Sequence, residues 1–308
     1  MAHKIYDNFY LSNEVEDQFN SHLDLQTFCN VDNSLVGTPG MIRKINRYKA
    51  TDGTEKLGMG EGNTKSIEVS YTDRSYTIQL AQNRFQYYDE QEMTDPMLVP
   101  TGVRHMGTDM FNTVNADIYA EFNKATLNVV TSTFDFDCFA NAQSLLNLEN
   151  LESKTTFAFV HPSDVAAIRK SAKETLQYVT AFAVNGYVGT IAGTNIYTKK
   201  DAISGTIIMA TRDAVTIFNK KGVEVEQPQR DSEDANVRLN TIISRKYYLV
   251  ALTDERYAVK IVKGTAAASN DTTVSSEKAY YKPAGLGYVL GTPTANPKTE
   301  GFFEITIS

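Results

Sequence analysis

The sequence predicts an α+β fold organised around one long amphipathic helix. Across 95–126, apolar residues recur at gaps of three and four, which places them in one stripe on a helical face. The members of this stripe are Val99, Val103, Met106, Met110, Val114, Ile118 and Phe122. Segments on both sides of the helix alternate apolar and polar residues, and this period of two is typical of strands. A chain of 308 residues can bury a sizeable core around such elements.

Proline marks the expected start of the long helix. Asp95-Pro96 has the pattern of an N-cap followed by proline at the first helical position. From Met97 to Thr126 the helix would be roughly 45 Å long at about 1.5 Å per residue. Pro100 is expected to kink or delay the first turn of this helix.

The composition excludes several classes of protein. Lys plus Arg number 30 and Asp plus Glu number 37, so the net charge of −7 argues against an electrostatic grip on nucleic acid. Cys29 and Cys138 make neither a metal-ligand spacing nor a disulfide framework, which fits a reducing compartment. No run approaches 18 apolar residues, so we expect neither a signal peptide nor a membrane-spanning helix.

Before the long helix, the sequence predicts an N-terminal arm and a projecting ribbon. Residues 1–36 are polar with scattered aromatic residues, allow one short helix at 13–25, and are expected to lie on another surface. Residues 41–48 and 65–80 have strand patterns, and the four glycines of 50–64 predict a flexible hairpin tip. Two-stranded hairpins are marginal in water, so this ribbon should be stabilised by a neighbouring subunit. Residues 83–92 are expected to form a linker.

After the long helix, shorter elements are expected. Asp135 or Asp137 can cap a short helix that runs to Leu148, and Ser163 can cap a second helix at 163–175. Strands are expected at 155–161 and at 206–211, with the second one buried. Residues 214–219 and 223–226 have the pattern of a hairpin that turns at Lys220-Lys221-Gly222.

The C-terminal third is expected to be rich in strands. A charged connector at 227–236 leads to strands at 236–244, 245–251 and 256–262, where β-branched residues are frequent. Residues 264–276 have the composition of a flexible linker, and 278–308 resemble a small β appendage. One alternative stays open, because 302–307 alternate imperfectly and could pair with the sheet of the body.

No motif in the sequence predicts catalysis. The histidines His3, His22, His105 and His161 are scattered, and Asp135-Phe136-Asp137 fits a loop with a helix cap better than an acid–base pair. Residues 58–62 superficially resemble a phosphate-binding glycine loop but lack the strand–loop–helix context. We therefore expect no catalytic, cofactor-binding or metal-binding residues, and no enzyme.

The order of these parts resembles the major capsid protein of tailed double-stranded DNA bacteriophages, which has the Hong Kong 97-type fold. In this resemblance, 41–80 match the extended E-loop and 95–126 match the spine helix of the peripheral (P) domain. The stretch FVHPSDVAAIRK at 159–170 looks like the entry into the axial (A) domain. The strongest similarity lies at 205–261, which contain GTIIMATRDAVTIFNKKGVEVE and NVRLNTIISRKYYLVALTDERYAVKI.

The resemblance implies a division of the chain into five parts. These are an N-terminal arm (1–36), the E-loop ribbon with its linker (37–92), the P domain (93–158 and 237–262), the A domain (159–236) and a C-terminal extension (263–308). No long, charged, helical segment precedes the arm, which implies a separate scaffolding protein.

The resemblance also implies a function and a set of partners. The protein would assemble in the cytoplasm of a bacterial host into pentamers and hexamers of an icosahedral virion shell. This shell would enclose double-stranded DNA without sequence-specific binding and without a membrane. Further copies, a scaffolding protein, a portal protein and a decoration protein would be the partners. Two alternatives remain: an encapsulin-type bacterial compartment shell, which has the same fold, and an α+β enzyme or ligand-binding protein.

Overall fold

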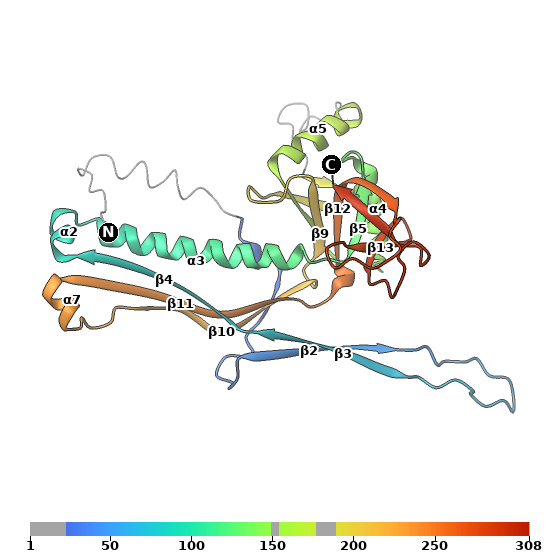
Figure 1. The fold of residues 1–308 in the computed structure, drawn as a ribbon, viewed down its shortest axis with the longest axis horizontal. Helices are drawn as coiled ribbons and strands as arrows, with labels where there is room; N and C mark the ends of the chain where they lie inside the picture. The colour runs from blue at the N-terminus through green and yellow to red at the C-terminus, as the bar shows by residue number, and fades with distance from the viewer. Residues whose placement is uncertain (1–22, 149–153, 177–188, 308) are drawn as a thin grey trace.

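The computed structural model describes residues 23–148, 154–176 and 189–307. Within these residues the chain forms a four-stranded, a nine-stranded and a two-stranded sheet, together with several helices. Figure 1 shows three parts: an elongated limb, a globular end and a thin ribbon that projects beyond the globular end. The α+β class predicted from the sequence is confirmed.

The limb is built from helix α3 (Leu98–Phe122) and the four-stranded sheet on which it lies. The strands follow the order β1 (Asn30–Asp32), β10 (Val215–Glu226), β11 (Leu239–Leu252) and β4 (Gln79–Tyr88). The apolar stripe predicted for the helix is confirmed from Met106 onward, since Met106, Met110, Val114, Ile118 and Phe122 are buried, whereas Val103 is 38% exposed. Short helices α2 (Asp89–Thr94) and α7 (Ser232–Val237) close the far end of the limb (Figure 1).

The start of the long helix differs from the prediction. Asp95 is the C-cap of α2 rather than the N-cap of α3, and its carboxylate accepts a hydrogen bond from Met97 N at 3.0 Å. The helix therefore begins at Leu98 and ends at Phe122, short of Thr126. Pro100 lies in the first turn, where a helix uses none of its backbone N–H groups.

The strands of the limb are longer than predicted. The hairpin expected at Lys220-Lys221-Gly222 is wrong, because β10 runs through this segment with register shifts between Asn219 and Lys221 and between Lys221 and Glu224. β11 continues across the break expected after Ser244, and β4 occupies most of the expected linker. These strands run along a 25-residue helix, and only a sheet of matching length covers the whole apolar stripe of that helix.

In the described residues, the globular end is a nine-stranded sheet with two helices. Its core strands are β5 (Leu127–Thr131), β6 (Thr156–Val160), β9 (Thr206–Thr211) and β12 (Ala258–Ala268), and the hairpin β7 (Thr190–Ile191)–β8 (Thr194–Thr198) extends one edge. Helices α4 (Phe136–Leu146) and α5 (Pro162–Leu176) belong to the same part (Figure 1). The prediction of a buried strand at 206–211 is confirmed residue for residue.

Two helix caps test the sequence analysis directly. Asp135 caps α4 as predicted, since its Oδ1 accepts a hydrogen bond from Cys138 N at 3.0 Å. The cap expected from Ser163 is wrong, because α5 begins at Pro162 and His161 Nδ1 accepts the hydrogen bond from Ser163 N at 3.2 Å. Proline at the first helical position suits this start.

The C-terminal segment is part of the nine-stranded sheet. β12 continues to Ala268, so the linker predicted at 264–276 is wrong over its first residues. The appended strands are β13 (Tyr280–Ala284), β14 (Gly287–Gly291) and β15 (Phe303–Ile307). β14 pairs with β5 and β15 pairs with β12, so these five strands close on themselves. The alternative that 302–307 join the sheet of the body is therefore the correct one.

The described end of the arm is built into the body. A 3₁₀ turn, η1 (Leu25–Phe28), buries Leu25 against α3, and β1 pairs in parallel with β10. Asn115 of α3 holds this segment, since its side chain accepts from Leu25 N at 3.2 Å and donates to Leu23 O at 3.0 Å. The helix predicted at 13–25 lies almost entirely outside the described residues.

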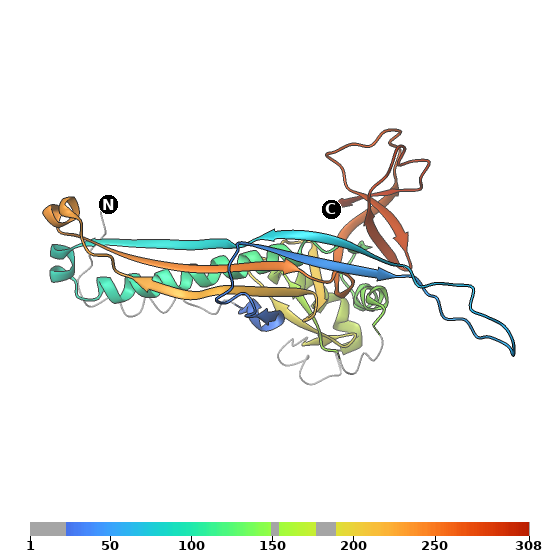
Figure 2. The same cartoon turned by 90° about the horizontal axis from the view of Figure 1, so that it is seen from below.

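The ribbon consists of β2 (Ile42–Ala50), β3 (Val69–Thr77) and the loop between them. As predicted, these strands form a sheet of their own, and Figure 2 shows the ribbon extending away from the rest of the chain. Only the root packs on the body, where Ile45 and Tyr76 contact a cluster formed by Leu35, Ile78, Phe218, Leu249 and Ala251.

Membership of the two larger sheets cuts across the ranges expected for the P and A domains. β10 comes from the expected A range of 159–236 but lies in the limb. β5, α4 and all of β12 come from the expected P and extension ranges but lie in the globular end.

Candidate functional site

Among the described residues, the two histidines and the paired aspartates do not form a common site. His105 is exposed on α3, His161 caps α5, and Asp135 caps α4, while His3 and His22 lie outside the described residues. Across 23–148, 154–176 and 189–307 no three His, Cys, Asp or Glu side chains gather closely enough to hold a metal ion. None of the described helices is both long enough and apolar enough to cross a membrane.

The glycine-rich tip of the ribbon forms a local turn. Glu61 N donates to Gly58 O at 3.2 Å, and the Glu61 carboxylate accepts from Gly58 N at 2.9 Å. A second carboxylate, that of Glu55, accepts from Thr64 N at 2.9 Å and forms an ion pair with Lys65 at 3.7 Å. The acidic side chains of the tip thus already accept from two of its backbone N–H groups, those of Gly58 and Thr64.

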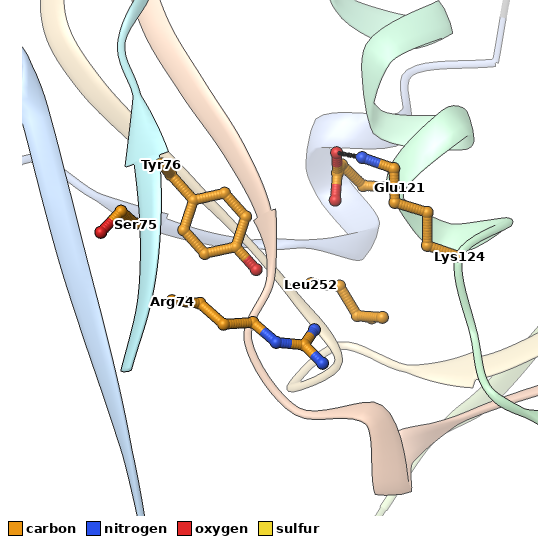
Figure 3. A pocket seen from close by; sticks show the side chains of 6 residues that line it. All are labelled: Arg74, Ser75, Tyr76, Glu121, Lys124 and Leu252. Carbon is orange, nitrogen blue, oxygen red and sulfur yellow. Dashed lines mark hydrogen bonds and ion pairs between the residues drawn. The ribbon is translucent and has the colours of Figure 1, made fainter. Parts of the chain in front are cut away.

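A cavity of about 310 Å³ lies at the root of the ribbon. It is lined by Arg74, Ser75, Tyr76, Glu121, Lys124 and Leu252, so that it separates β3 from the end of α3 and from β11 (Figure 3). Its charged groups are paired: Lys124 with Glu121, and Arg74 Nη1 with Glu255 Oε1 at 2.6 Å. The cavity therefore lies at the joint between ribbon and body, because the Arg74–Glu255 ion pair connects the two across it.

The ribbon presents two different faces. One face packs at its root through Ile45 and Tyr76, with Arg43 placed over the Phe218 ring at 5.5 Å. The period of two and the strand register put Ile42, Val69 and Tyr71 on the opposite face, where they are 65%, 65% and 66% exposed. Val69 and Tyr71 lie together toward the outer end of this face, whereas Ile42 lies at its root, with Lys44 and Asp73 between them. The apolar side chains at the outer end are candidates for contact with another surface.

The far end of the limb is held together by a polar network. The Arg230 guanidinium donates to both carboxylate oxygens of Asp89 and to Asn240 Oδ1, at 2.9 Å from its Nε. Asn240 Nδ2 in turn donates to Asp89 at 2.7 Å. The hydrogen bonds from Arg230 hold the pKa of the Asp89 carboxyl below its usual value. This network joins the segment before α7 to α2 and β11, so the elements at the far end of the limb are tied together.

Comparison with known proteins bears on the role of these surfaces. No protein-family model matches the sequence. A major capsid protein of Staphylococcus phage phiMR11 is 25% identical over 264 residues, which cover 82% of this chain and 92% of that protein. Among solved structures, the mature capsid of bacteriophage PhiM1 matches with a TM-score of 0.62 at 11% identity, covering 85% of this chain and 92% of that one.

This chain has the Hong Kong 97-type capsid fold. The resemblance to phage major capsid proteins expected from the sequence is confirmed. The encapsulin SrpI of Synechococcus elongatus PCC 7942 also matches, with a TM-score of 0.58 at 12% identity over 78% of this chain and 86% of that one. The fold alone therefore does not separate capsids from encapsulins.

Within this capsid fold, the sequence predicts the ribbon and the long helix but not the residues that join the ribbon, the limb and the globular end. Arg74 and Glu255, like Arg230 and Asp89, are far apart in the sequence and carry no local pattern. Only the capping residues carry a pattern that can be recognised in the sequence, because a cap lies next to the helix whose N–H groups it accepts from.

Proposed function

We propose that this chain is the structural subunit of a phage head. It assembles into pentameric and hexameric capsomers of an icosahedral shell that encloses packaged double-stranded DNA. The carrying observation is the combination of an elongated limb, a projecting ribbon with exposed apolar side chains, and similarity to a phage capsid protein over most of both chains. In such a shell the subunit works by its surfaces and has no enzymatic role.

The parts of the fold suggest distinct tasks. We assign the limb to the P domain, the globular end to the A domain around the capsomer axis, and the ribbon to the E-loop. Head-to-tail contacts between identical subunits close into rings when the rotation permits, which gives capsomers. The ribbon lies over a neighbour in this arrangement, so its exposed apolar side chains become buried there.

The proposal extends to partners and location. A net charge of −7 suits a wall that encloses DNA without binding it tightly. Assembly takes place in the host cytoplasm with a separate scaffolding protein, and the finished subunit belongs to the virion with a portal protein at one vertex. The C-terminal strands β13–β15 offer a surface for a decoration protein.

An encapsulin-type compartment is the second candidate, favoured by the structural match to an encapsulin. The phage capsid is preferred because the sequence match is to a phage major capsid protein. The contents of shells purified from the native source separate the two: packaged DNA supports the capsid, and an enclosed enzyme supports the compartment. Nothing in the described residues favours the third alternative, an enzyme.

Deletion of the ribbon tip tests the proposal. Removing 51–63 leaves Ala50 and Val69 joined by five residues, and the hydrogen bonds that this deletion removes from the tip lie within the loop itself. We expect a subunit with an unchanged unfolding midpoint that forms few or no shells in negative-stain microscopy, while the full chain forms uniform icosahedral particles.

A matched control keeps the full length of the loop and replaces Asp52 and Lys56, two exposed residues of the loop, by serine. This variant should still form shells. Full assembly by the deletion variant would contradict the role given to the ribbon. A full chain that stays monomeric with its scaffold present would contradict the proposed function as a whole.

A further inference from the structure

The closed set of five strands at the C-terminal end has a concave inner face. β13, β14 and β15 complete this set against β12 and β5. The ring centroids of Tyr288 on β14 and Phe303 on β15 lie 5.4 Å apart, although β13 runs between these two strands. Rings that are two strands apart meet where the sheet curves strongly and both rings point to its concave side. Tyr288 and Phe303 therefore lie on the inner face.

Two more apolar side chains lie on this inner face. Tyr281 of β13 pairs in register with Leu290 of β14 and with Phe303 of β15, and paired side chains point to the same side of a sheet. Tyr281, Tyr288 and Phe303 are half-buried, and Leu290 is 44% exposed. Part of this aromatic surface is thus open to a ligand.

The neighbouring strand β12 contributes small side chains to the inner face. Ala268 pairs with Phe303, so Ala268, Ala266 and Gly264 follow one another on this face at intervals of two. Side chains normally fill the interior of a small barrel. Glycine and alanine occupy little of this interior, and the aromatic rings beside them are therefore not fully buried.

One cation belongs to the same side of the sheet. Val259 and Ile261 belong to the core cluster that contains α4, so Lys260 between them points to the opposite side. Lys260 pairs in register with Asn128, and Asn128 pairs with Tyr288. The lysine is thus two strands away from Tyr288, a backbone separation of about 10 Å.

The polar groups of this face lack partners within the part of the chain that the structure describes. No described carboxylate pairs with Lys260, and burial lowers the pKa of its ammonium group. The hydroxyls of Tyr281 and Tyr288 likewise form no hydrogen bond with another described residue, and burial raises the pKa of Tyr281. Half-buried polar groups without partners cost free energy, so a ligand that pairs with them gains affinity.

These groups discriminate between classes of ligand. An apolar peptide would cover the rings but would leave the ammonium and both hydroxyls unpaired. A single-stranded nucleic acid would stack on the rings, but its phosphates need a row of cations, and the described part of this face carries a single one. A saccharide that bears a carboxylate satisfies every group. Its C–H surface packs on the electron-rich faces of the rings, its hydroxyls bond to the tyrosines, and its carboxylate pairs with the ammonium.

We infer that the inner face of the C-terminal strands binds an acidic saccharide. The sugar rings pack on Tyr281, Tyr288 and Phe303, and a carboxylate of the saccharide pairs with Lys260. This site goes beyond the proposed function, because it adds a binding activity to a chain whose other surfaces serve assembly. It lies within one subunit, so unassembled chains and shells both carry it.

Titration of the full chain with tetragalacturonate, followed by saturation-transfer NMR of the saccharide, tests the inference. We expect saturable binding, with the largest transfer to the C–H protons that pack on the aromatic rings. Maltotetraose is the neutral counterpart and should bind about tenfold more weakly, because it lacks the carboxylates that pair with the lysine.

Two lysines on β12 provide a matched pair of variants. Lys260→Gln removes the cation and should weaken the binding of tetragalacturonate about tenfold, while the unfolding midpoint stays at least as high as in the native chain. Lys263→Gln changes the same residue type on the opposite side of the same strand, where it is exposed, and should bind like the native chain. Tyr281→Phe with Tyr288→Phe keeps the rings but removes the hydroxyls, and should weaken the binding of both saccharides.

Several results would overturn the inference. These are no binding of tetragalacturonate, equally tight binding of the neutral saccharide, and equal affinities of the Lys260 and Lys263 variants. Tighter binding of a single-stranded oligothymidine than of tetragalacturonate would assign the face to nucleic acid instead. If the Lys260 variant fails to fold, the comparison of the acidic with the neutral saccharide on the native chain decides. None of these results depends on whether the chain forms shells, so they leave the proposed function to its own test.

Discussion

Glu300 shows how one side chain orders a loop that has little regular structure. Its carboxylate accepts hydrogen bonds from the backbone N–H groups of Thr294, Ala295 and Asn296, at 3.0, 2.7 and 3.0 Å. These bonds favour the ionised form and lower the pKa of Glu300 to about 2. In the unfolded chain a glutamate titrates near about 4.3. The carboxylate therefore stabilises the fold fully above that pH, and the contribution is lost as the pH falls toward 2.

Replacing Glu300 with glutamine should lower the unfolding midpoint at pH 7, because one amide oxygen replaces two charged acceptors. The difference from the native chain should shrink as the pH is lowered from 5 to 2.5, since the native carboxylate is then losing its advantage. Thermal unfolding at several pH values measures this. Glu277→Gln, an exposed position in the same segment, is the control and should leave the midpoint unchanged. A pH-independent difference would mean that ionisation plays no part.

At the residue scale, the sequence predicts features whose partner is a near neighbour. Asp135 is a cap because Cys138 is three residues away. The predicted cap of α5, Ser163, lies two residues after the actual cap, His161, because a histidine that accepts at Nδ1 is a rarer cap than a serine. Tyr248, buried against α3, donates to Asp117, and no local pattern connects these two residues.

At the scale of the element, α3 provides a direct test of the apolar stripe. Val114 is 1% exposed and lies in the cluster beneath the helix, whereas Ala116, two residues on, is exposed. Val114→Asp places an unpaired charge in the core and should cost on the order of 4 kcal/mol of unfolding free energy. Ala116→Asp should cost less than about 1 kcal/mol, which is the loss of helix propensity.

Chemical denaturation of both variants measures the difference. We expect the Val114 variant to aggregate or to express poorly if the full cost exceeds the stability of the subunit. Similar midpoints for the two variants would mean that the stripe is not the buried face of α3.

Strand ends were harder to predict than strand positions. The period of two locates β10 and β11, but the ends of a strand depend on the partner that it runs along. Lys220-Lys221-Gly222 has the composition of a turn, yet β11 pairs with β10 on both sides of it. The glycine therefore lies in a bulge of β10 rather than in a turn. The same reasoning applies to β12, whose last residues look like a linker until β15 pairs with them.

At the scale of the whole molecule, the parts are connected by repeated crossings of the chain. β10 and β11 belong to the limb, whereas β9 before them and β12 after them belong to the globular end. The limb and the globular end therefore share their strand connections, and only the ribbon extends from them as a separate sheet. The ribbon could be predicted from the sequence because it is contiguous in the chain, while the limb and the globular end are each assembled from distant segments.

The C-terminal strands provide the test at this scale. The sequence alone predicts that truncation after Lys263 preserves the folded subunit, because 264–276 resemble a linker. The structure leads to the opposite expectation. Truncation there removes the half of β12 that pairs with β15, together with Tyr280 and Phe302, each 2% exposed. Gly264 lets the two strands approach closely, since a Cβ there would lie 2.1 Å from Thr306 O.

We therefore expect the chain truncated after Lys263 to unfold at a clearly lower midpoint than the full chain. Phe302→Ala isolates one part of this loss without shortening the chain and should cost about 3–5 kcal/mol, the usual range for a buried aromatic residue. Leu286→Ala, at a position that is 64% exposed in the same segment, should stay within about 0.5 kcal/mol. If the truncated chain and the Phe302 variant both unfold at the native midpoint, the closed set of strands contributes nothing to the body, and β13–β15 are an appendage after all. If only the truncated chain is destabilised, the pairing of β15 with β12 carries the stability rather than the buried aromatic residues.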